Sequence, residues 1–466
     1  MTGLGQIVVV ALLAPLVYLL FTNRYERALY YGIFLLVSQS RFLLFRLPGA
    51  VPNLTIHRLV FICLVLGWIC QPGLGERLRR VPYRRVFNLW FVVGLISLAG
   101  SVNLQLSIKT YLSFVLQVYV LYLMLSTSIS TFEQTMSIVR SIFLGLALVA
   151  VIAFTERTFQ MNPLVWLNPE ITSLVSAHDV VSTMDHRILM GTAMAMGWPL
   201  GMALLQIEPL RSRSKLLIWL GILLLIMCCY FSMSRGPWVA TFLAGVGLAV
   251  LLPKGARTPL YTVLVCVLLA LLLRPGILDT LTVRAEHTFS EDTLKHSTFM
   301  YRFELWKISF AGISDSMWKI LFGNGPGLAS DAAFDWTLSY SGSDMTISSW
   351  DNHYAALMYN TGIVGLLAMI LLQAFVLLGL LRMQREFQGE KRAVWTCVLA
   401  SAGTYIFMMT NVFIFAPQLS YVFWALIGAC MGNWRRSASD LPRASEDAND
   451  KALQRGAPLD VDPLRC

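Results

Sequence analysis

Long apolar runs recur along the whole chain, and they constrain its fold more than any other feature. A helix needs about 20 residues to cross a hydrocarbon core of about 30 Å, and most of these runs approach that length. Hydrophobic residues make up 56% of the chain and charged residues only 13%. A soluble domain has roughly 45–50% and 25%, so a soluble core cannot absorb this excess. The sequence therefore predicts an all-α fold, a polytopic transmembrane helical bundle.

The runs predict about 12–13 spanning helices. The first run lacks a basic segment before it and a small-residue cleavage site after it, so we expect a retained helix rather than a signal peptide. The candidate spans are residues 4–21, 28–45, 56–70, 86–100, 111–126, 142–154, 188–206, 216–231, 238–252, 260–273, 355–381, 393–412 and 421–431.

The spans divide the chain into four predicted parts. Residues 1–273 form a transmembrane block of about ten helices, and residues 274–350 form one large external loop. Residues 351–432 return to the membrane as C-terminal helices. Residues 433–466 are polar, contain three prolines and have balanced charge, which predicts a disordered cytoplasmic tail.

Short basic loops predict the orientation. Lys and Arg gather at Arg24 and Arg27 and in the segments 76–85, 211–215, 253–258 and 382–392, which fall on one side of the predicted spans. Cytoplasmic loops carry an excess of Lys and Arg, so we place this side in the cytoplasm. The same rule explains the formal charge of +10 without a nucleic-acid partner, and the lipid bilayer remains the expected surroundings.

Motifs for several common chemistries are missing from the sequence. It contains no GxxxxGK[ST], no HExxH and no paired Cys/His motif. The eight cysteines lie mostly in apolar runs and include no CxxC pair, so neither disulfides nor a zinc site is predicted. We therefore expect neither a metal nor another cofactor.

The first candidate site lies in SMSRGPWVA (232–240), where Arg235 ends one apolar helix and Gly236-Pro237 breaks the chain before the next. A charged side chain at that depth is costly, and it often marks function. Alternatively, Arg235 reaches the membrane surface or caps the last carbonyls of the preceding helix.

The second candidate lies in the predicted loop. FMYRFELWKISFAGI (299–313) has aromatic residues at spacings of three to four, which predicts an amphipathic helix that lies on the membrane surface. Arg302 belongs to this helix, either as a site residue or on a solvated face. The segment ILFGNGPGL (320–328) predicts a glycine-rich turn. The aromatic residues of the helix are Phe299, Phe303, Trp306 and Phe310.

The third candidate is SSWDNHYAALMYNTGIVGLL (348–367), where a polar cluster enters a long apolar helix that is interrupted at Asn360-Thr361-Gly362. Alternatively, Asp351 or Asn352 only caps the helix, and Tyr354 sits in the aromatic belt of the membrane. The cluster consists of Asp351, Asn352, His353 and Tyr354.

Taken in order, these motifs resemble a known family. An N-terminal helical block, an SRG break, a large loop with R-x-x-x-W, a G-x-G-x-G turn and a D-N-x-Y entry into a G-I-x-G-L helix are similar to the O-antigen ligase and Wzy-type polymerase superfamily. The resemblance covers roughly residues 188–381. HRILMGTAMAMGWPLG (186–201), which contains Arg187, resembles a degraded form of the family's R-x-x-G segment.

The resemblance implies an enzyme of the bacterial cytoplasmic (inner) membrane whose active site faces the periplasm. Its donors would be undecaprenyl-pyrophosphate-linked oligosaccharides, used without a nucleotide sugar, metal or cofactor. Arg235 and Arg302 match arginines of the family's motifs. Chain-length regulators and export proteins are implied as partners.

Physical chemistry supports these roles. Guanidinium groups bind phosphate oxygens bidentately and keep their proton, so Arg235 and Arg302 can neutralise a pyrophosphate leaving group. The acceptor hydroxyl must lose a proton, and His353 or Asp351 is the candidate base. The remaining candidates are Asn352 and Tyr354, which would orient this region, and Arg187, a further phosphate contact.

Several functions fit this pattern. Ligases of the superfamily have histidine directly before asparagine, whereas Asp351 stands there in this chain, and this favours a polymerase of O-antigen, capsule or exopolysaccharide. An O-antigen ligase or a protein oligosaccharyltransferase would share the chemistry and differ in the acceptor. A transporter or flippase would show repeat symmetry and polar residues near the midplane of the membrane, whereas the polar clusters here gather at external helix ends. If the protein were structural or sensory, the three motifs would have no role.

Overall fold

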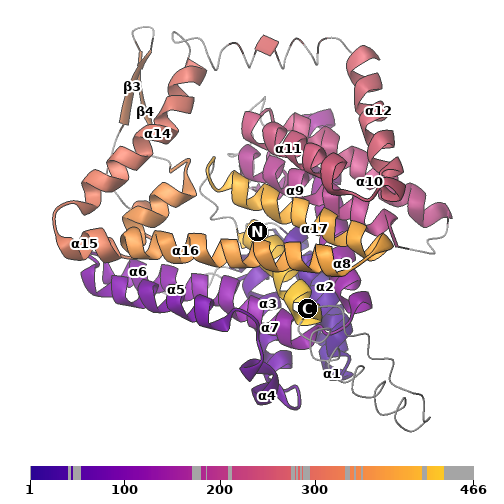
Figure 1. The fold of residues 1–466 in the computed structure, drawn as a ribbon, viewed down its shortest axis with the longest axis horizontal. Helices are drawn as coiled ribbons and strands as arrows, with labels where there is room; N and C mark the ends of the chain where they lie inside the picture. Colours follow the sequence, from indigo (N-terminus) through magenta and orange to yellow (C-terminus); the bar gives the residue numbers. More distant parts are fainter. Residues whose placement is uncertain are drawn as a thin grey trace, which may run out of the picture.

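The structure, a computed structural model, describes most of the chain. The described residues are 2–39, 44–45, 54–169, 180–184, 186–207, 212–273, 294–330, 336–340, 343–347, 350–411 and 417–434, with isolated residues between 273 and 294. Helices form nearly all of this part, and two short antiparallel hairpins complete it (Figure 1).

The elements of the N-terminal half are mainly long apolar helices. The main ones are α1 (Gly3–Phe21), α2 (Tyr25–Ser38), β1 (Leu44–Phe45), β2 (Leu54–Thr55), α3 (Ile56–Ile69), α4 (Leu74–Arg79), α5 (Arg84–Ser97), α6 (Leu104–Phe114), the π-helix η2 (Val115–Val120), α7 (Leu121–Ser128), α8 (Phe132–Phe159), α9 (Arg187–Leu205) and α10 (Ser212–Phe231).

The C-terminal half adds the remaining helices and a second hairpin. Its elements are α11 (Arg235–Leu251), α12 (Thr258–Leu273), α14 (Leu294–Ile313), α15 (Met317–Phe322), β3 (Trp336–Tyr340), β4 (Ser343–Ile347), α16 (His353–Glu386), α17 (Gly389–Met408) and a last helix over residues 417–434.

The predicted all-α transmembrane fold is confirmed. Each of the candidate spans overlaps a helix of the structure. Among the described residues, six helices are long and apolar enough to cross a membrane, and α3, α11 and α12 are shorter apolar helices. The most buried span is α9, which lies between α8, α10, α11 and α17. The bundle therefore has α9 at its centre.

The second predicted span is wrong at its C-terminal end. It was expected to continue as helix to residue 45, but α2 ends at Ser38. Leu44 and Phe45 form β1 instead and pair with β2. A short apolar run satisfies the requirements of a strand as well as those of a helix, so hydropathy alone could not place this boundary.

Three of the basic loops lie at one end of the molecule, as the sequence predicted for them. The guanidinium of Arg77 donates to the carbonyl of Thr127 at 3.3 Å, and the indole of Trp434 donates to Glu386 at 3.3 Å. The ring of Tyr83 stacks on Trp434 at a centroid distance of 6.2 Å. We call this the basic end, formed by residues 24–27, 77–85, 128–132, 386–391 and 434.

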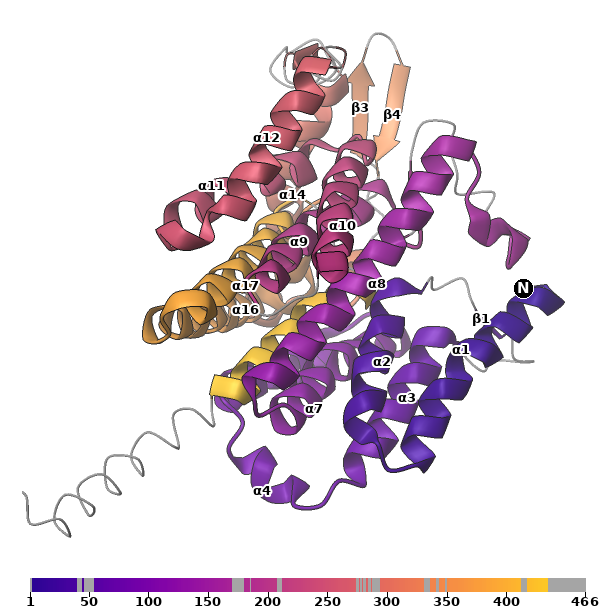
Figure 2. The same cartoon turned by 90° about the vertical axis from the view of Figure 1, so that its right-hand side faces the viewer.

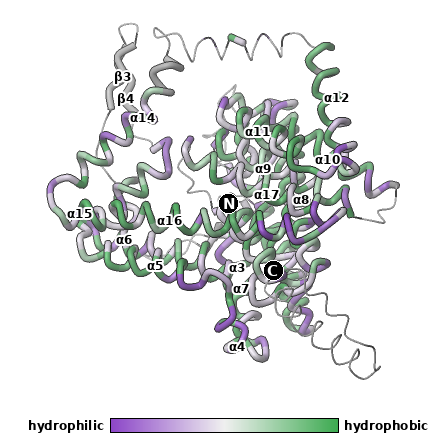
Figure 3. The backbone as a smooth tube through the Cα atoms, viewed as in Figure 1, coloured by the Kyte–Doolittle hydropathy of each residue, from purple (hydrophilic) through white to green (hydrophobic). Residues whose placement is uncertain are grey.

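The opposite end carries the β3–β4 hairpin, as both ribbon views show (Figures 1 and 2). Helix α4 projects from the basic end, and its hydrophilic stretch contrasts with the hydrophobic colour that dominates the long helices (Figure 3). The predicted external loop thus contains the ordered elements α14, α15 and the hairpin. The predicted tail begins inside the last helix, at residues 433–434, and its remaining residues lie outside the described part.

Helix α16 bends sharply at Gly362. This glycine has φ 66° and ψ −170°, a region of backbone space that is essentially restricted to glycine. The hydroxyl of Tyr354 donates to Oε1 of Gln373 at 2.8 Å. In a straight helix these two residues would be about 28 Å apart. Residues 353–361 are therefore a separate short helix that folds back on residues 363–386.

A glycine-rich turn fixes this bend. The backbone N–H groups of Asn324 and Gly325 donate to the carbonyls of Tyr359 and Asn360 at 3.0 and 2.9 Å. These carbonyls end the short helix, where no intrahelical donor follows. Gly323 has φ 74°, and a Cβ on it would lie 2.4 Å from the Asn360 backbone. The predicted turn at residues 320–328 is confirmed, and it caps the C-terminus of the short helix.

Candidate functional site

Three of the sequence motifs meet at the C-terminal end of α17. The backbone N–H of His353, the first residue of α16, donates to the Met409 carbonyl at 2.8 Å. Arg235 was expected to end the preceding helix, but α10 ends at Phe231 and Arg235 begins α11, because a proline is tolerated in the first turn of a helix. A Cβ on Gly236, in this first turn, would lie 3.2 Å from the Met408 side chain and 3.5 Å from Asn411. The guanidinium Nε of Arg302, on α14, donates to the Asn411 carbonyl at 3.4 Å. Residues 408–411 therefore join α11, α14 and α16.

The first turns of α9 and α11 are also in contact. A Cβ on Gly191 would lie 2.7 Å from the Ser232 hydroxyl and 2.8 Å from the Pro237 ring. Arg187 begins α9 one turn before Gly191, and His186 caps the helix by accepting the Ile188 N–H. The N-termini of α9, α11 and α16 therefore lie in one region of the molecule. Each N-terminus carries a partial positive charge, so this region favours an anion.

Arg302 and Asp351 form an ion pair within this region. Nη2 of Arg302 lies 3.7 Å from Oδ2 of Asp351, and their side chains are 18% and 29% exposed. Burial lowers the pKa of Arg302, and the neighbouring carboxylate partly offsets this effect. Burial and the Asp351 charge both raise the pKa of Tyr301, so this phenol stays protonated. The pair is recessed and still in reach of solvent.

Helix α14 is fixed by a small core of its own. Tyr301 and Leu305 are buried against Trp350 and the first turns of α16. The Ser309 hydroxyl donates to the carbonyl of Ala355 at 2.8 Å. These contacts hold Arg302 above the N-terminus of α16, so the packing of the loop sets the geometry of the ion pair.

The opposite face of α14 exposes two aromatic side chains, with the charged side chain of Lys307 between them. The predicted helix over residues 299–313 is confirmed, and the side chains of Phe303 and Phe310 are 54% and 53% exposed. An exposed face of aromatic residues agrees with the prediction of a helix at the membrane surface. Arg302 lies on the packed side of the helix, and the alternative of a solvated face is wrong for it.

The remaining residues of the cluster have different surroundings. Asn352 is buried and caps α16, since its Oδ1 accepts the N–H of Ala355 at 3.1 Å. His353 is buried to 5% exposure beneath the end of α17. The hydroxyl of Tyr354 lies between the two parts of α16 and also donates to the Ile406 carbonyl at 3.3 Å. Asn352 and Tyr354 therefore hold the helix in place, and Asp351 is the more accessible of the two candidate bases.

Sequence reasoning missed Asn411 and the structural role of Asn360. Asn360 accepts the Ala329 N–H at its Oδ1 at 2.7 Å, and its carbonyl accepts the Ser97 hydroxyl at 2.8 Å. Asn411 follows the apolar run of α17 in the pair Thr410-Asn411, and a polar pair at the end of a span could have indicated it. Within the described residues, no group of three or more His, Cys, Asp or Glu side chains is placed to hold a metal ion.

The fold and this region define a multi-pass membrane protein with a recessed arginine–aspartate pair at one end of its helical bundle. Residues 220–370, about a third of the chain, match a family model described as O-antigen ligase (Wzy_C). The match supports the O-antigen ligase and Wzy superfamily, and it confirms the resemblance seen in the motifs. It includes Arg235, Arg302 and the 351–354 cluster, while Arg187 lies outside it. No curated protein matches the chain.

Proposed function

We propose that the protein transfers glycans from an undecaprenyl-pyrophosphate carrier and joins them into a surface polysaccharide. The observation that carries the proposal is the recessed pair of Arg302 and Asp351 beside the N-termini of α11 and α16. A glycosyl transfer needs positive charge for the leaving diphosphate and a base for the acceptor hydroxyl. A guanidinium and a carboxylate in one place can supply both. The family match supports the same class of chemistry.

The leaving group needs positive charge. When the bond between the anomeric carbon and the phosphate oxygen breaks, the electron pair goes to the diphosphate. Arg302 and Arg235, together with the N-terminus of α11, stabilise this developing charge. Such donors act more strongly where water is excluded, and Arg302 is already held in a recessed position by the packing of α14.

The acceptor hydroxyl needs a base as its oxygen bonds to the anomeric carbon. We assign the removal of the hydroxyl proton to Asp351, because its carboxylate is more accessible than the buried imidazole of His353. In the resting protein Asp351 is paired with Arg302. A bound diphosphate competes for the guanidinium and would release the carboxylate to meet the acceptor hydroxyl. Donor binding would thereby prepare the acceptor side of the reaction.

The side of the membrane that the site faces follows from the orientation of the helical bundle. The basic end faces the cytoplasm by the positive-inside rule, so the site faces the periplasm of a bacterial inner membrane. The lipid tail of the donor would lie in the bilayer, and its glycan would reach the site from the aqueous side. Chain-length regulators and export proteins are the expected partners.

An O-antigen ligase is the second candidate function. The description of the family that matches residues 220–370 favours it. The D-N-x-Y sequence at Asp351 favours a polymerase instead. The two enzymes share a donor and differ in the acceptor, which is the end of another lipid-linked chain in one case and lipid A core in the other.

A deletion strain distinguishes the two functions. The gene is deleted and complemented with wild type or Arg302→Ala, membrane levels are measured, and surface glycans are separated on a gel. A polymerase is indicated if the null strain shows single repeat units on lipid A core, and a ligase if it accumulates long polymer on the lipid carrier. An Arg302→Ala protein that is present at normal level and restores wild-type glycan would refute the proposed site.

A further inference from the structure

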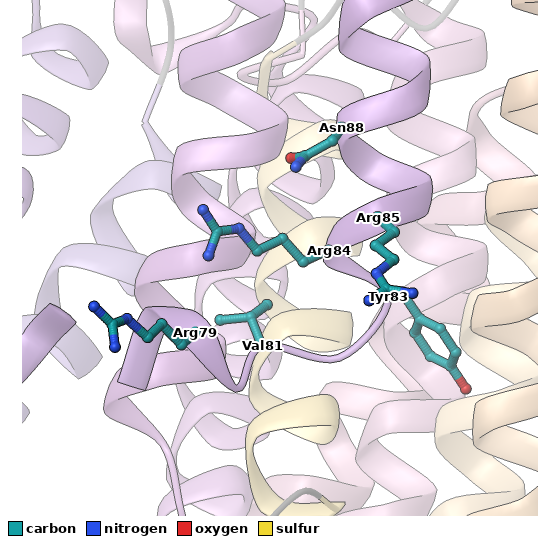
Figure 4. A pocket seen from close by; sticks show the side chains of 6 residues that line it. All are labelled: Arg79, Val81, Tyr83, Arg84, Arg85 and Asn88. Carbon is teal, nitrogen blue, oxygen red and sulfur yellow. The ribbon is translucent and has the colours of Figure 1, made fainter. Parts of the chain in front are cut away.

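A pocket at the basic end is unrelated to the site described above. It lies where α4 turns into α5, and it encloses about 790 Å³ of space not filled by protein atoms, open solvent included. Figure 4 shows the side chains that line it, with Arg79 and Arg84 extending to the same side past Val81. The lining residues are Arg79, Val81, Tyr83, Arg84, Arg85 and Asn88.

The charged side chains that the structure describes in this pocket are all positive. Among the lining residues that the structure describes, three are arginines and none is acidic. A neighbouring pocket at the same end differs, because Glu26 is among its lining residues and accepts a hydrogen bond from Tyr30. The guanidinium of Arg84 also donates to the Leu78 carbonyl at 3.0 Å, which fixes it near the end of α4. The pocket at α4–α5 therefore favours an anionic ligand.

An apolar stripe begins directly beyond the arginines. Along α5, Leu89, Val92 and Leu95 are 47%, 50% and 54% exposed. They follow Arg85 at spacings of three to four residues, so all four lie on one face of the helix. From Arg85 to Leu95 this face is about 15 Å long. A cluster of arginines followed by an apolar stripe is complementary to a lipid that has an anionic headgroup followed by an acyl chain.

The neighbouring segment supplies a second apolar wall. Leu116, on the π-helix η2, is 46% exposed. Tyr119, on the same segment, donates its hydroxyl to Oδ1 of Asn88 and stacks its ring on Phe87 and Phe91 of α5. These contacts hold η2 against α5 and fix the amide of Asn88, which lines the pocket.

We propose that this pocket binds the phosphate of an anionic glycerophospholipid, with one acyl chain along the exposed face of α5. Arg79 and Arg84, which extend to the same side of the pocket, would hold the phosphate, and guanidinium groups suit its oxygens. Arg85 lines the pocket on the side of Tyr83 and adds positive charge there. Clusters of arginine and lysine at the cytoplasmic end of an apolar helix are a known type of site for anionic headgroups. A bound lipid would anchor α4 and the first turn of α5 at the membrane surface. The proposal does not depend on the glycan chemistry at the other end.

Lipid-dependent stabilisation of the purified full-length protein tests this proposal. Thermal unfolding in detergent is followed as phosphatidylglycerol is added, with phosphatidylcholine and soluble glycerophosphoglycerol as comparison ligands. We expect phosphatidylglycerol to raise the melting temperature, and phosphatidylcholine and the soluble headgroup to leave it unchanged. Each arginine near a membrane surface contributes about 1 kcal/mol to anionic-lipid binding, so the double variant Arg79→Gln/Arg85→Gln should bind about 30-fold more weakly.

The control variant is Arg213→Gln. Arg213 is exposed in the first turn of α10 and lies outside this pocket, and its loss changes the net charge without touching α4 or α5. This variant should keep the wild-type response to phosphatidylglycerol. The proposal is overturned if the double variant responds like wild type, if phosphatidylcholine stabilises equally, or if the soluble headgroup alone reproduces the effect. Native mass spectrometry of the same proteins reports directly whether phosphatidylglycerol is retained.

Discussion

Arginines at the two ends of this molecule are held in opposite ways. At the site end, Arg302 is 18% exposed, pairs with Asp351 and contacts the end of α17. At the basic end, Arg84 and Arg85 are exposed in a pocket whose described lining residues include no acid. A recessed charge needs a partner within the protein, whereas an exposed one is stabilised by water and by anions outside. A recessed, paired arginine is suited to a role in catalysis. Exposed arginines are suited to the reversible binding of an anionic ligand.

The largest expected effect is at the recessed arginine. Arg302→Ala removes the charge that we propose to face the leaving group, and it should lower the transfer rate by about 10²–10³-fold. The rate is measured with purified protein and a synthetic lipid-linked oligosaccharide. Lys307→Ala is the matched control, because Lys307 is on the same helix with its side chain 76% exposed. If both variants lost transfer activity equally, the effect would come from the structure of α14 and not from the charge of Arg302.

The next effect separates the two candidate bases. Asp351→Asn keeps the size of the side chain and removes the proton acceptor, so turnover should fall by about 10²-fold. His353→Gln should change turnover by less than about 10-fold, provided that it folds, since the imidazole is buried. Thermal unfolding and membrane level are measured for both. The opposite ranking of turnover would assign the base to His353.

A third prediction concerns the bend that positions the site. Gly362→Ala should destabilise the protein by about 1–3 kcal/mol or more, because its backbone conformation is restricted to glycine. In addition, the new Cβ would lie 2.4 Å from the Leu321 backbone. Gly403→Ala in α17 is the control, since a Cβ there meets nothing within 4 Å. It should be neutral or stabilising by up to about 1 kcal/mol. Apparent melting temperatures in one detergent compare the two.

The smallest effect is expected at the basic end. Arg85→Ala should change the stability of the lipid-free protein by no more than about 0.5 kcal/mol, as is usual for an exposed residue. The transfer rate in detergent should also stay within about twofold of wild type, because the pocket is remote from the site. Thermal unfolding and the same transfer assay measure both quantities. A loss of activity comparable to that of Arg302→Ala would remove the contrast between the two ends.

The helical architecture could be predicted from the sequence because membrane burial acts on each segment separately. An apolar run such as residues 142–154, which lies within α8, must form a helix to satisfy its own backbone in lipid, whatever the rest of the chain does. The prediction was wrong where that rule is weakest, at Leu44 and Phe45, which belong to a short run and form a strand. The interruption at Gly362 was visible in the sequence, but the direction of the resulting bend was not.

The candidate site was less accessible to sequence reasoning because it depends on contacts between distant segments. The motifs indicated Arg302 and Asp351 separately, and their pairing follows from the way in which Tyr301 and Leu305 pack on α16. The Asn411 contact uses a backbone carbonyl, which every residue has and no motif records. The family match covers the site motifs, and the roles of the individual residues stay predictions.

On the proposed function, the bend in α16 would also set the depth in the membrane at which the substrate reacts. Residues 363–386 alone are about 36 Å long, enough to cross the hydrocarbon core of about 30 Å. The preceding nine residues are therefore not needed for crossing, and they can lie near the boundary between lipid and water. A carrier lipid would then present its reactive bond at the level of its own headgroup. No part of the growing hydrophilic chain would have to enter the bilayer during synthesis.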